Sequence, residues 1–469
     1  MSATAASASP SPAQGAGFLE RRFRLSERGT SARVELLGGV ATFLTMSYIL
    51  FVNPAILSAA GMPFRAVAVA TAIAAAVTTL AMGLFTNLPF ALAPGLGINA
   101  VVAFDIVLGR KVHWPVAMSI VVIEGLIALV LVLAGLRTAI MRAVPLSLKL
   151  AIGVGIGLFI TLVGLREGGI VINNPATGIG LGELTGGAPL VALAGILVAA
   201  VLVARGVRGA VVLGVLAATV LGLIFGVLKG PSGVVDVPGS GDFSTIGDAL
   251  DPSNLGDALT LALIPVIFSL FMSDFFDTIG TAVAVGRGAG LVDEQGEMEG
   301  VGRLLLVDSA AASVGGAMGC SSVTTYVESG AGVAEGARTG LSSVVVAALF
   351  ALAILFVPVI SLVGQDVKLG ETLIHPAIAP ALVMVGYLMI RIVADIDWSL
   401  PENSVPAFLT IAGIPMTFSI AAGIGLGVIG YVVTMVATGK ARAIHPLMWV
   451  IAPFFVAFFA ANWLSKNVF

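Results

Sequence analysis

The sequence contains very little charge. Asp, Glu, Lys and Arg make up 10% of its 469 residues, whereas soluble domains average about 25%. Hydrophobic residues reach 58%, and the mean hydropathy is +1.08. A soluble fold of this composition would expose large apolar areas to water, and a lipid bilayer removes that cost. The net charge of −3 gives no electrostatic basis for binding nucleic acid.

Cysteine and histidine are also scarce. The single cysteine, Cys320, excludes an intramolecular disulfide and a multi-cysteine metal site. The three histidines (His113, His375 and His445) lie near the ends of apolar segments, so we expect no metal site and no cofactor. Glycine and proline, by contrast, are abundant at 58 and 22 residues. Within long apolar segments they indicate closely packed and broken helices.

Apolar segments long enough to cross a bilayer recur along the chain. A spanning helix needs about 20 mostly apolar residues. Two segments, 87–106 and 320–335, are apolar but interrupted by Gly, Pro, Ser and Thr, so we expect irregular backbone in them. With both included, the sequence predicts about fourteen crossings. The other candidate spans are 36–59, 66–86, 114–135, 146–165, 188–205, 209–228, 256–285, 302–318, 340–363, 373–393, 404–437 and 446–464. The span at 404–437 is long enough to include an extra short helix at Pro401–Pro415.

Basic residues near the first span predict the orientation. Residues 1–17 are rich in Ala, Ser and Pro and are predicted to be disordered. Five arginines precede the first apolar run, at Arg21, Arg22, Arg24, Arg28 and Arg33. By the positive-inside rule they place the N-terminus in the cytoplasm, and an even number of crossings places the C-terminus there too. The sequence thus predicts a multi-pass protein of the cell inner (plasma) membrane.

The two halves of the chain look alike. The longest loop, 229–255, separates two sets of about seven segments. The broken segments begin in matching places, at 83–95 and 316–330, each as a short extended stretch that ends at a glycine. An odd number of spans per half makes the repeats inverted, and paired broken segments are typical of the binding site of a secondary transporter.

Two aspartates lie inside one apolar segment. Asp274 and Asp277 are three residues apart, so on a helix they share a face, and Thr278 and Thr281 extend the polar stripe. A charge in the hydrocarbon core costs about 2.5–3.5 kcal/mol on insertion scales. Two carboxylates this close do not both ionise comfortably there, so we expect a shared or exchangeable proton. The alternative is a structural pair that caps backbone or meets a basic partner between helices.

Further polar residues mark the broken segments. Glu328 lies at the second break, where it could accept hydrogen bonds from a ligand, and Asn99 holds the matching place in the first half. Asp308 and Glu124 are also embedded in apolar sequence, and we expect them to relay protons or to pair with a hydroxyl. The alternatives are an N-cap or a cavity edge for Glu328 and an interhelical hydrogen bond for Asn99. Phe276 is one of several aromatics able to stack on a planar ring.

Several carboxyls and an amide, with no convergent Arg or Lys, argue against an anionic substrate. They suit a cation or a neutral molecule rich in N–H donors, and a purine or pyrimidine base fits.

Four motifs in order carry a resemblance to a known family. They are Asn53-Pro54, Pro94-Gly95-Leu96-Gly97-Ile98-Asn99, Phe276-Asp277-Thr278-Ile279-Gly280-Thr281 and Thr324-Thr325-Tyr326-Val327-Glu328-Ser329. From about Arg33 to the C-terminus the chain resembles the adenine/guanine/hypoxanthine permease branch of the nucleobase–cation symporters (the xanthine/uracil permease superfamily). The resemblance implies an all-α membrane fold of fourteen segments in two inverted repeats of seven. It also implies short antiparallel strands in segments 3 and 10, a substrate-holding core domain, and a gate domain that forms a homodimer.

Mapped onto this chain, the resemblance implies domain boundaries. The expected parts are a cytoplasmic N-terminus at 1–33, the core domain at 34–145 and 256–363, the gate domain at 146–229 and 364–469, and an extracytoplasmic loop at 230–255.

The resemblance also implies roles for individual residues. Asp277 and Glu328 match the carboxylates that hydrogen-bond the base, and Tyr326 is the strand neighbour of Glu328. The expected substrate-binding residues are Asp277, Glu328, Asn99, Thr278, Tyr326 and Phe276, and the expected proton-coupling residues are Asp274, Asp277, Asp308 and Glu328. Uracil-transporting relatives have a histidine one turn beyond the first carboxylate, where this chain has Thr281. This difference favours purines and leaves proton coupling to carboxylates.

The sequence therefore predicts a transporter, not an enzyme, that imports purine bases by proton symport through alternating access. Two alternatives remain at this stage. One is transport of a pyrimidine, xanthine or an anion on the same fold, although an anion site would favour a basic residue in place of Glu328. The other is an intramembrane aspartyl protease, although its two aspartates usually come from different helices, whereas Asp274 and Asp277 share one.

Overall fold

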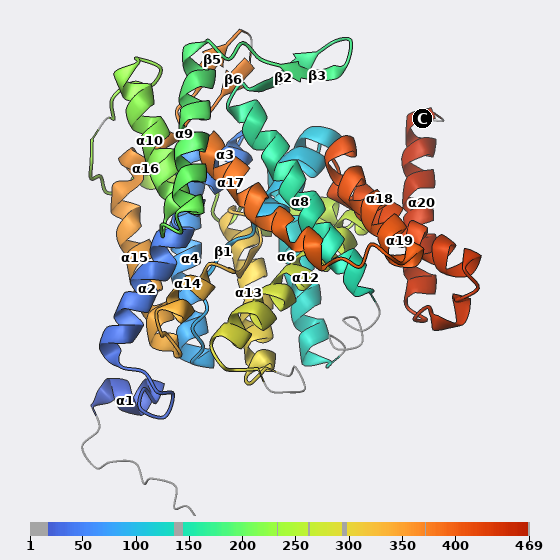
Figure 1. Cartoon of the computed structure of the whole chain (residues 1–469), viewed down its shortest axis with the longest axis horizontal. Coiled ribbons are helices and arrows are strands. Elements are labelled where there is room, and N and C mark those ends of the chain that lie inside the picture. The colour runs from blue at the N-terminus through green and yellow to red at the C-terminus, as the bar shows by residue number, and fades with distance from the viewer. Residues whose placement is uncertain are drawn as a thin grey trace, which may run out of the picture.

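The computed structural model describes residues 17–135, 144–231, 233–260, 263–292, 298–370 and 372–467. Within these ranges the side chains of Pro265, Phe276, Ile279, Val283, Phe458 and 461–467 lie outside the description. Helices make up most of the described chain, and Figure 1 shows most of them extending, some steeply and some obliquely, between two opposite faces of the molecule. We call the face that carries α1 the α1 face. The opposite face carries the hairpins β2–β3 and β5–β6, and we call it the hairpin face.

The first half of the chain contains one broken crossing among continuous ones. Its elements are α1 (Phe18–Phe23), α2 (Ala32–Met46), α3 (Ile49–Ser58), α4 (Phe64–Thr86), β1 (Leu92–Pro94), α5 (Leu96–Ala100), a π-helix η1 (Val101–Gly109), α6 (Trp114–Leu133), α8 (Leu146–Glu167), β2 (Val171–Asn174), β3 (Gly178–Leu181), α9 (Gly187–Ala204) and α10 (Ala210–Ile224).

The second half repeats this pattern. After the 3-10 turns η2 (Ser240–Phe243) and η3 (Asp248–Leu250) come α11 (Pro252–Ala258), α12 (Ile264–Gly288), α13 (Val301–Met318), β4 (Val323–Thr325), α14 (Ser329–Ala334), α15 (Gly340–Ala353), η4 (Ile354–Phe356), α16 (Val357–Val363), β5 (Val367–Leu369), β6 (Thr372–Ile374), α17 (Ala379–Ile390), η5 (Arg391–Asp395), α18 (Pro401–Thr417), α19 (Ile420–Ala437), η6 (Ala441–Ala443) and α20 (Met448–Asn467).

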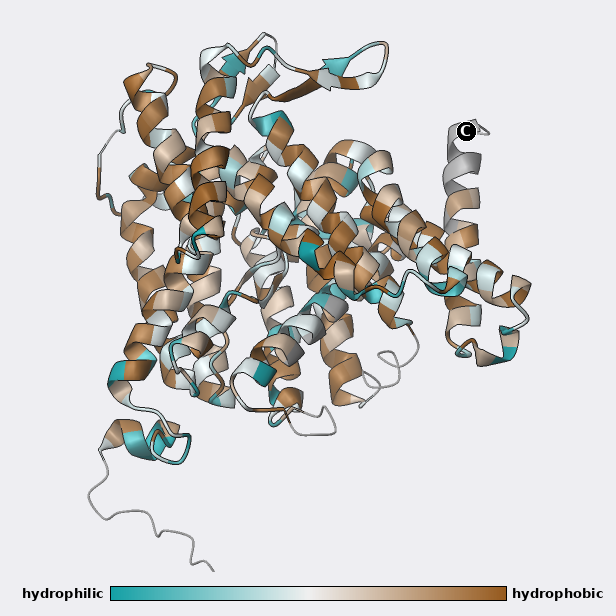
Figure 2. Ribbon diagram, in the orientation of Figure 1, coloured by the Kyte–Doolittle hydropathy of each residue, from teal (hydrophilic) through white to brown (hydrophobic). Residues whose placement is uncertain are grey.

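The helices have the length and composition of membrane spans. In the described parts of the chain, nine are long and apolar enough to cross a bilayer, and three shorter apolar helices accompany them. Apolar residues follow the helices along their length, while hydrophilic ones gather in α1 and the loops (Figure 2). Every predicted span coincides with a helix or a broken pair of elements. The prediction of a helical polytopic fold is confirmed.

Near the C-terminus the structure contains the extra helix that the sequence allowed at Pro401–Pro415, here Pro401–Thr417. The segment 404–437 forms two helices, α18 and α19, because Phe418 adopts a left-handed conformation and the Ser419 side chain then caps α19 by accepting from the Ala422 N–H. The expectation that both termini lie in the cytoplasm stays a prediction, because residues 1–16 and 468–469 lie outside the described chain. The last helix, α20, ends toward the hairpin face, opposite α1 (Figure 1).

The helices pack in two groups. In the first group, α4 packs on α13 and α15, α6 on α13, and α2 on α14 and α15. In the second group, α8 packs on α17 and α18, α9 on α10 and α17, and α18 on α19. The first group falls in the range predicted for the core domain and the second in the range predicted for the gate domain. We refer to them as the core group and the gate group, and the boundaries themselves stay a prediction.

Glycine allows the closest helix crossing in the core group. A Cβ on Gly83 of α4 would lie 2.6 Å from the Gly340 carbonyl oxygen at the start of α15. Without side chains at the crossing, the two backbones approach more closely than any larger residue allows. Small residues play this part in membrane helix pairs because apolar side chains gain little by leaving lipid.

We expect Gly83→Leu to destabilise the fold by about 1–3 kcal/mol, since the added side chain must displace α15. Thermal unfolding of the purified protein in detergent measures the effect. Gly302→Leu on α13 is the matched control, because a Cβ there meets no atom within 4 Å. Equal unfolding temperatures for the two variants would contradict the crossing as described.

A buried histidine joins two acidic residues on the hairpin face. His375 lies between β6 and α17, where Nδ1 is 2.7 Å from Glu167 Oε2 and Nε2 is 2.9 Å from Asp366 Oδ1. Burial by itself lowers the pKa of His375. The hydrogen bond and charge of Glu167, together with Asp366, outweigh it and raise the pKa above its ordinary value of 6.5. Both ring nitrogens can donate only in the protonated ring.

This arrangement predicts a pH-dependent stability. Because the folded-state pKa of His375 is raised, its contribution is fully present below about pH 6.5 and is lost as the pH rises through the folded-state pKa. We expect the unfolding temperature to fall over that window, and His375→Gln to flatten the fall. His445→Gln, which alters a ring that accepts the Leu447 N–H, should leave the profile unchanged.

Candidate functional site

Two short strands from opposite halves of the chain pair in the core group. Strand β1 runs antiparallel to β4, with Leu92 opposite Thr325 and Pro94 opposite Val323. Each strand follows a long helix, α4 or α13, and precedes a short helix, α5 or α14. The sequence predicted extended backbone in both places. The structure confirms the strands and shows that they pair with each other.

Residues just outside the two strands add further hydrogen bonds between them. The Tyr326 hydroxyl donates to the Pro94 carbonyl oxygen at 2.5 Å, and the Tyr326 N–H donates to the Ala91 carbonyl at 2.9 Å. The Ala91 N–H in turn donates to the Ser329 hydroxyl at 3.0 Å. Tyr326 therefore ties β1 to the segment after β4. Its role as a substrate ligand stays a prediction.

Asp308 of α13 connects three elements. Its Oδ2 accepts from the Thr278 hydroxyl of α12 at 2.7 Å, and its Oδ1 accepts from the Thr325 N–H of β4 at 2.9 Å. The Thr278 hydroxyl also lies 2.8 Å from the hydroxyl of Thr324. All four side chains are buried. The carboxylate thus holds strand β4 against α12 and α13, in line with a supporting role for Asp308.

Two other carboxylates, Asp277 and Glu328, lie within electrostatic range of each other. Asp277, near the middle of α12, has an exposed side chain, whereas Asp274 and Thr278 on the same helix are buried. The Asp277 carboxyl lies within electrostatic range of Asp308 and Glu328. Asp277 and Glu328 were predicted to act together, and the fold brings them into one cluster although 51 positions separate them in the sequence.

Glu328 is held by a tyrosine. The Tyr48 hydroxyl donates to Glu328 Oε1 at 2.5 Å, and Tyr48 is 2% exposed. Glu328 occupies the N-cap position of α14, yet its side chain makes no capping hydrogen bond. The capping alternative considered for Glu328 therefore does not apply.

Asn99 of α5 is a buried amide with open hydrogen-bonding capacity. Its side chain is fully buried, and neither its oxygen nor its nitrogen has a hydrogen-bond partner within the described residues. Buried polar groups are nearly always paired with protein, water or ligand. The interhelical hydrogen bond considered for Asn99 is not found in the described chain, which favours a group that meets water or substrate. The side chain of Phe276, predicted to stack on the substrate, lies outside the described side chains.

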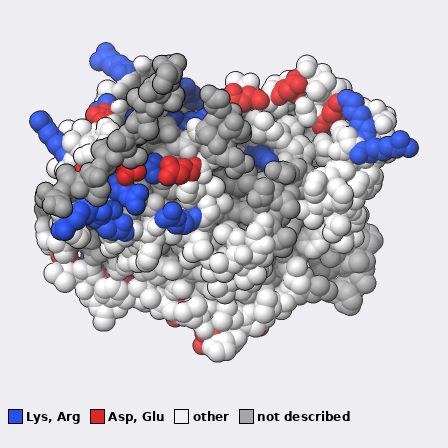
Figure 3. Space-filling view, turned by 90° about the horizontal axis from the view of Figure 1, so that it is seen from below, with Lys and Arg blue, Asp and Glu red and all other residues white. Residues whose placement is uncertain are grey.

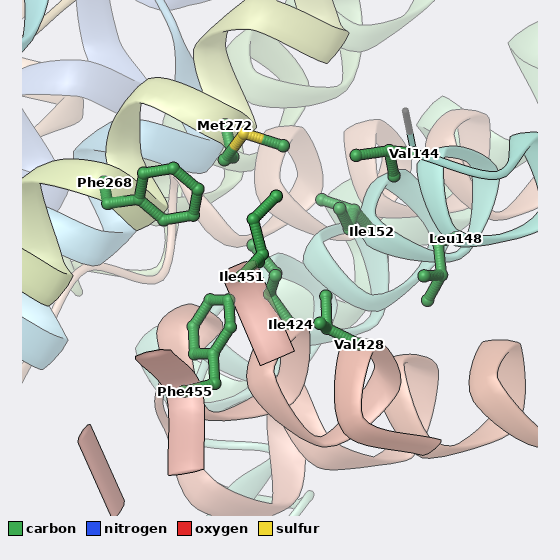
Figure 4. Close-up of a pocket in the computed structure, with 9 residues that line it drawn as sticks. All are labelled: Val144, Leu148, Ile152, Phe268, Met272, Ile424, Val428, Ile451 and Phe455. Carbon is green, nitrogen blue, oxygen red and sulfur yellow. The ribbon is translucent and has the colours of Figure 1, made fainter. Parts of the chain in front are cut away.

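Earlier along α12, the helix packs on the gate group. Phe268 and Met272 point into a small space that α8, α19 and α20 enclose with apolar side chains (Figure 4). The cavity measures about 10 Å³, which is barely the volume that one water requires, and its lining is apolar. It is therefore no substrate site. Helix α12 carries apolar side chains toward the gate group at one end and carboxylates beside the strand pair further on.

Sequence reasoning found the carboxylates and missed their partners. Tyr48, Thr324 and Thr325 had no assigned role, and their contacts with Glu328 and Asp308 cross between distant segments. One signal for Tyr48 was present, since the chain has only four tyrosines and this one lies inside the first apolar span. The structure breaks that span at Ser47 and Tyr48, between α2 and α3.

The comparisons with known proteins agree with this architecture. A family model described as "Permease family" matches residues 33–426. The chain belongs to this permease family. It is accordingly a multi-pass membrane transporter and not an enzyme, and the intramembrane protease is set aside.

Curated relatives of this permease match it along nearly the whole chain. It is 42% identical to the guanine/hypoxanthine permease PbuG of Bacillus subtilis, covering 93% of this chain and 98% of the relative. It is 40% identical to the adenine permease AdeP of Escherichia coli, covering 94% and 96%. The predicted family resemblance is confirmed.

Solved structures of remote sequence share the fold. The transmembrane domain of the cyanobacterial bicarbonate transporter BicA superposes with a TM-score of 0.58 at 16% identity, covering 83% of this permease and 97% of that domain. The SLC26A9 structure gives a TM-score of 0.62 at 12% identity, covering 90% and 67%. At these identities the likeness concerns the fold alone.

We expect Asp308→Ala to destabilise the permease, because it leaves the Thr325 N–H and the Thr278 hydroxyl without their buried acceptor. Each orphaned buried group costs about 1–3 kcal/mol. Thermal unfolding in detergent measures the loss. Ser309→Ala, at a buried hydroxyl that donates within its own helix to the Leu305 carbonyl, is the neighbouring control. If the two variants unfold at the same temperature, Asp308 does not hold the strand.

Proposed function

We propose that this permease imports purine nucleobases by proton symport. The observation that carries the proposal is that the Asp277 carboxyl lies within electrostatic range of Glu328, the residue three positions after strand β4, in a chain in which only 10% of residues are charged. The relatives named as guanine/hypoxanthine and adenine permeases support purines as the substrate class.

The chemistry of the cluster suits a neutral, donor-rich ring. Carboxylate oxygens accept the N–H groups of a base, and the Asn99 amide can both donate and accept. Among the described residues, no ion pair joins Asp277 or Glu328 to Lys or Arg. An anionic substrate would need such a basic group, so the fold shared with the bicarbonate transporter BicA does not extend to its substrate.

Coupling to protons follows from the same cluster. Asp277 lies close enough to Asp308 and to Glu328 for their charges to repel its own. Charge at this depth in a membrane is costly, and a proton is the smallest compensating cation. Proton binding permits the base to bind, and the loaded, neutral site then crosses more easily. Asp274 stays a predicted member of the proton path.

Alternating access arises from movement of the core group against the gate group. The contact of Phe268 and Met272 with the gate helices is made by apolar side chains in the described lining, so it can change without exposing polar groups of that lining (Figure 4). Polar contacts between the groups lie elsewhere. The Ser419 hydroxyl donates to Asp105 Oδ2 at 2.5 Å, and Arg208 pairs with Glu335. These two contacts must break or change during the cycle.

The α1 face is the cytoplasmic one in this proposal. The five arginines before and within the start of α2 support this orientation. Lys and Arg side chains gather on the α1 face in the view from below (Figure 3). The permease then resides in the cell inner membrane. Homodimer formation through the gate group stays a prediction.

We expect Asp277→Asn and Glu328→Gln each to reduce purine uptake about 10- to 100-fold, since a hydrogen bond to a charged group contributes about 1.5–3 kcal/mol. Tyr48→Phe keeps the carboxylate and removes only its donor, so a smaller loss is expected. The measurement is uptake of radiolabelled adenine, guanine and hypoxanthine into proteoliposomes, with and without an inward proton gradient.

Glu183→Gln, at an exposed carboxylate between β3 and α9, is the matched control and should transport normally. Purine uptake that does not depend on the pH gradient would contradict proton symport. Normal purine uptake by both Asp277→Asn and Glu328→Gln would contradict the assignment of these residues to the substrate site.

A further inference from the structure

A long apolar groove lies on the core group, away from the carboxylates. Helices α4 and α13 form its two walls, and its volume is about 420 Å³, within the range of small-ligand sites. Its lining from α4 comprises Val77, Thr78, Ala81 and Phe85. The rim of the groove is open, because the Val77 side chain is 53% exposed and the Phe85 side chain 72% exposed.

The groove has a polar end and an apolar end. Arg303, at the start of α13, is its one charged lining residue. Arg303 is exposed, and its guanidinium has no ion pair within the described part of the chain. From Arg303 the wall of α13 runs through Leu306 and Ala310 to Val314. Helix α13 begins and α4 ends on the α1 face, so the charged end lies there.

A second arginine stands at the same end. Arg22 of α1 donates to the Leu84 carbonyl, next to the groove residue Phe85. The rest of the lining is apolar apart from the Thr78 hydroxyl, which is satisfied within its own helix by the Ala74 carbonyl at 2.7 Å. Positive charge therefore occurs at one end of the groove and hydrocarbon along the remainder.

The length of the groove matches one leaflet. From Val77 to Phe85 and from Arg303 to Val314 the walls extend roughly 12 and 16 Å at 1.5 Å per residue. Half of a hydrocarbon core of about 30 Å is about 15 Å. A transmembrane helix of a partner or of a second copy would follow α4 and α13 across the whole bilayer, whereas this groove follows them across one half.

We propose that the α4–α13 groove binds an anionic phospholipid of the leaflet at the α1 face. One acyl chain lies between the helices, and the phosphate group meets Arg303 and Arg22. Both walls belong to the core group, so the bound lipid moves together with the core group and makes no contact required for substrate recognition. The inference rests on the membrane orientation proposed above and is independent of the substrate.

The test is lipid binding by the delipidated, full-length protein in detergent, followed by native mass spectrometry. Phosphatidylglycerol and phosphatidylcholine with identical acyl chains are titrated separately. We expect wild type to prefer phosphatidylglycerol. Arg303→Gln should weaken phosphatidylglycerol binding about fivefold, as one basic residue near an anionic headgroup contributes about 1 kcal/mol. It should weaken phosphatidylcholine binding less, because the choline cation offsets the charge of the phosphate. Ala310→Phe, which fills the groove, should weaken both.

Arg287→Gln is the matched control, because Arg287 is an exposed arginine at the end of α12 that does not line the groove. It should bind both lipids as wild type does. Equal loss in Arg303→Gln and Arg287→Gln would show diffuse charge attraction and overturn the site. Unchanged lipid binding by Ala310→Phe would also overturn the site. A shift in oligomeric mass with that variant would instead assign the groove to a second copy of the chain. Purine uptake by each variant checks its folding and separates this result from the proposed function.

Discussion

The antiparallel pairing of β1 with β4 is the contact on which the site depends. Only three residues on each strand take part, yet the pair joins the two halves of the chain near the middle of their broken segments. An extended segment inside a membrane leaves backbone N–H and C=O groups without helical partners, and each such group is costly in hydrocarbon. The two breaks satisfy each other, and the short helices that follow them, α5 and α14, both pack on α12.

The hydrogen bonds around the strands divide the acidic residues by role. Asp308 accepts from β4 and α12 and so fixes where the strand lies. Glu328 is met by the single hydroxyl of Tyr48, and Asp277 remains exposed. The three acidic residues thus take different positions: Asp308 is buried and holds strand β4, Glu328 is half-buried, and Asp277 is exposed. A transporter needs both the buried and the exposed kind, because a ligand site in a moving domain must keep its shape while the domain moves.

Helix α12 shows how apolar and polar contacts are kept apart. Phe268 and Met272 face the gate group across an apolar surface, while Asp277 lies further along, by the strands. Sliding along an apolar surface exchanges one set of weak contacts for another. The polar links between the groups, Asp105 with Ser419 and Arg208 with Glu335, are few among the described residues and lie outside that surface. The groove on α4 and α13 is lined by the core group alone, so a lipid bound there would not hinder this movement.

The sequence by itself determined the membrane class, the spans and the two breaks, because burial in lipid demands long apolar runs and makes each embedded polar residue conspicuous. It also singled out Asp277, Glu328, Asp308 and Asn99 for that reason. Only the tertiary structure decided which of them meet and which partners they find, such as Tyr48 for Glu328 and Thr325 for Asp308. The sequence allowed an extra helix within 404–437, but the boundary between the two helices needed the structure, because it depends on a local backbone turn at Phe418 that hydropathy does not register. Hydropathy indicates only whether each residue favours lipid or water. The pairing of the two broken segments, which lie hundreds of residues apart, depends on backbone hydrogen bonds that form only once the two halves have packed together.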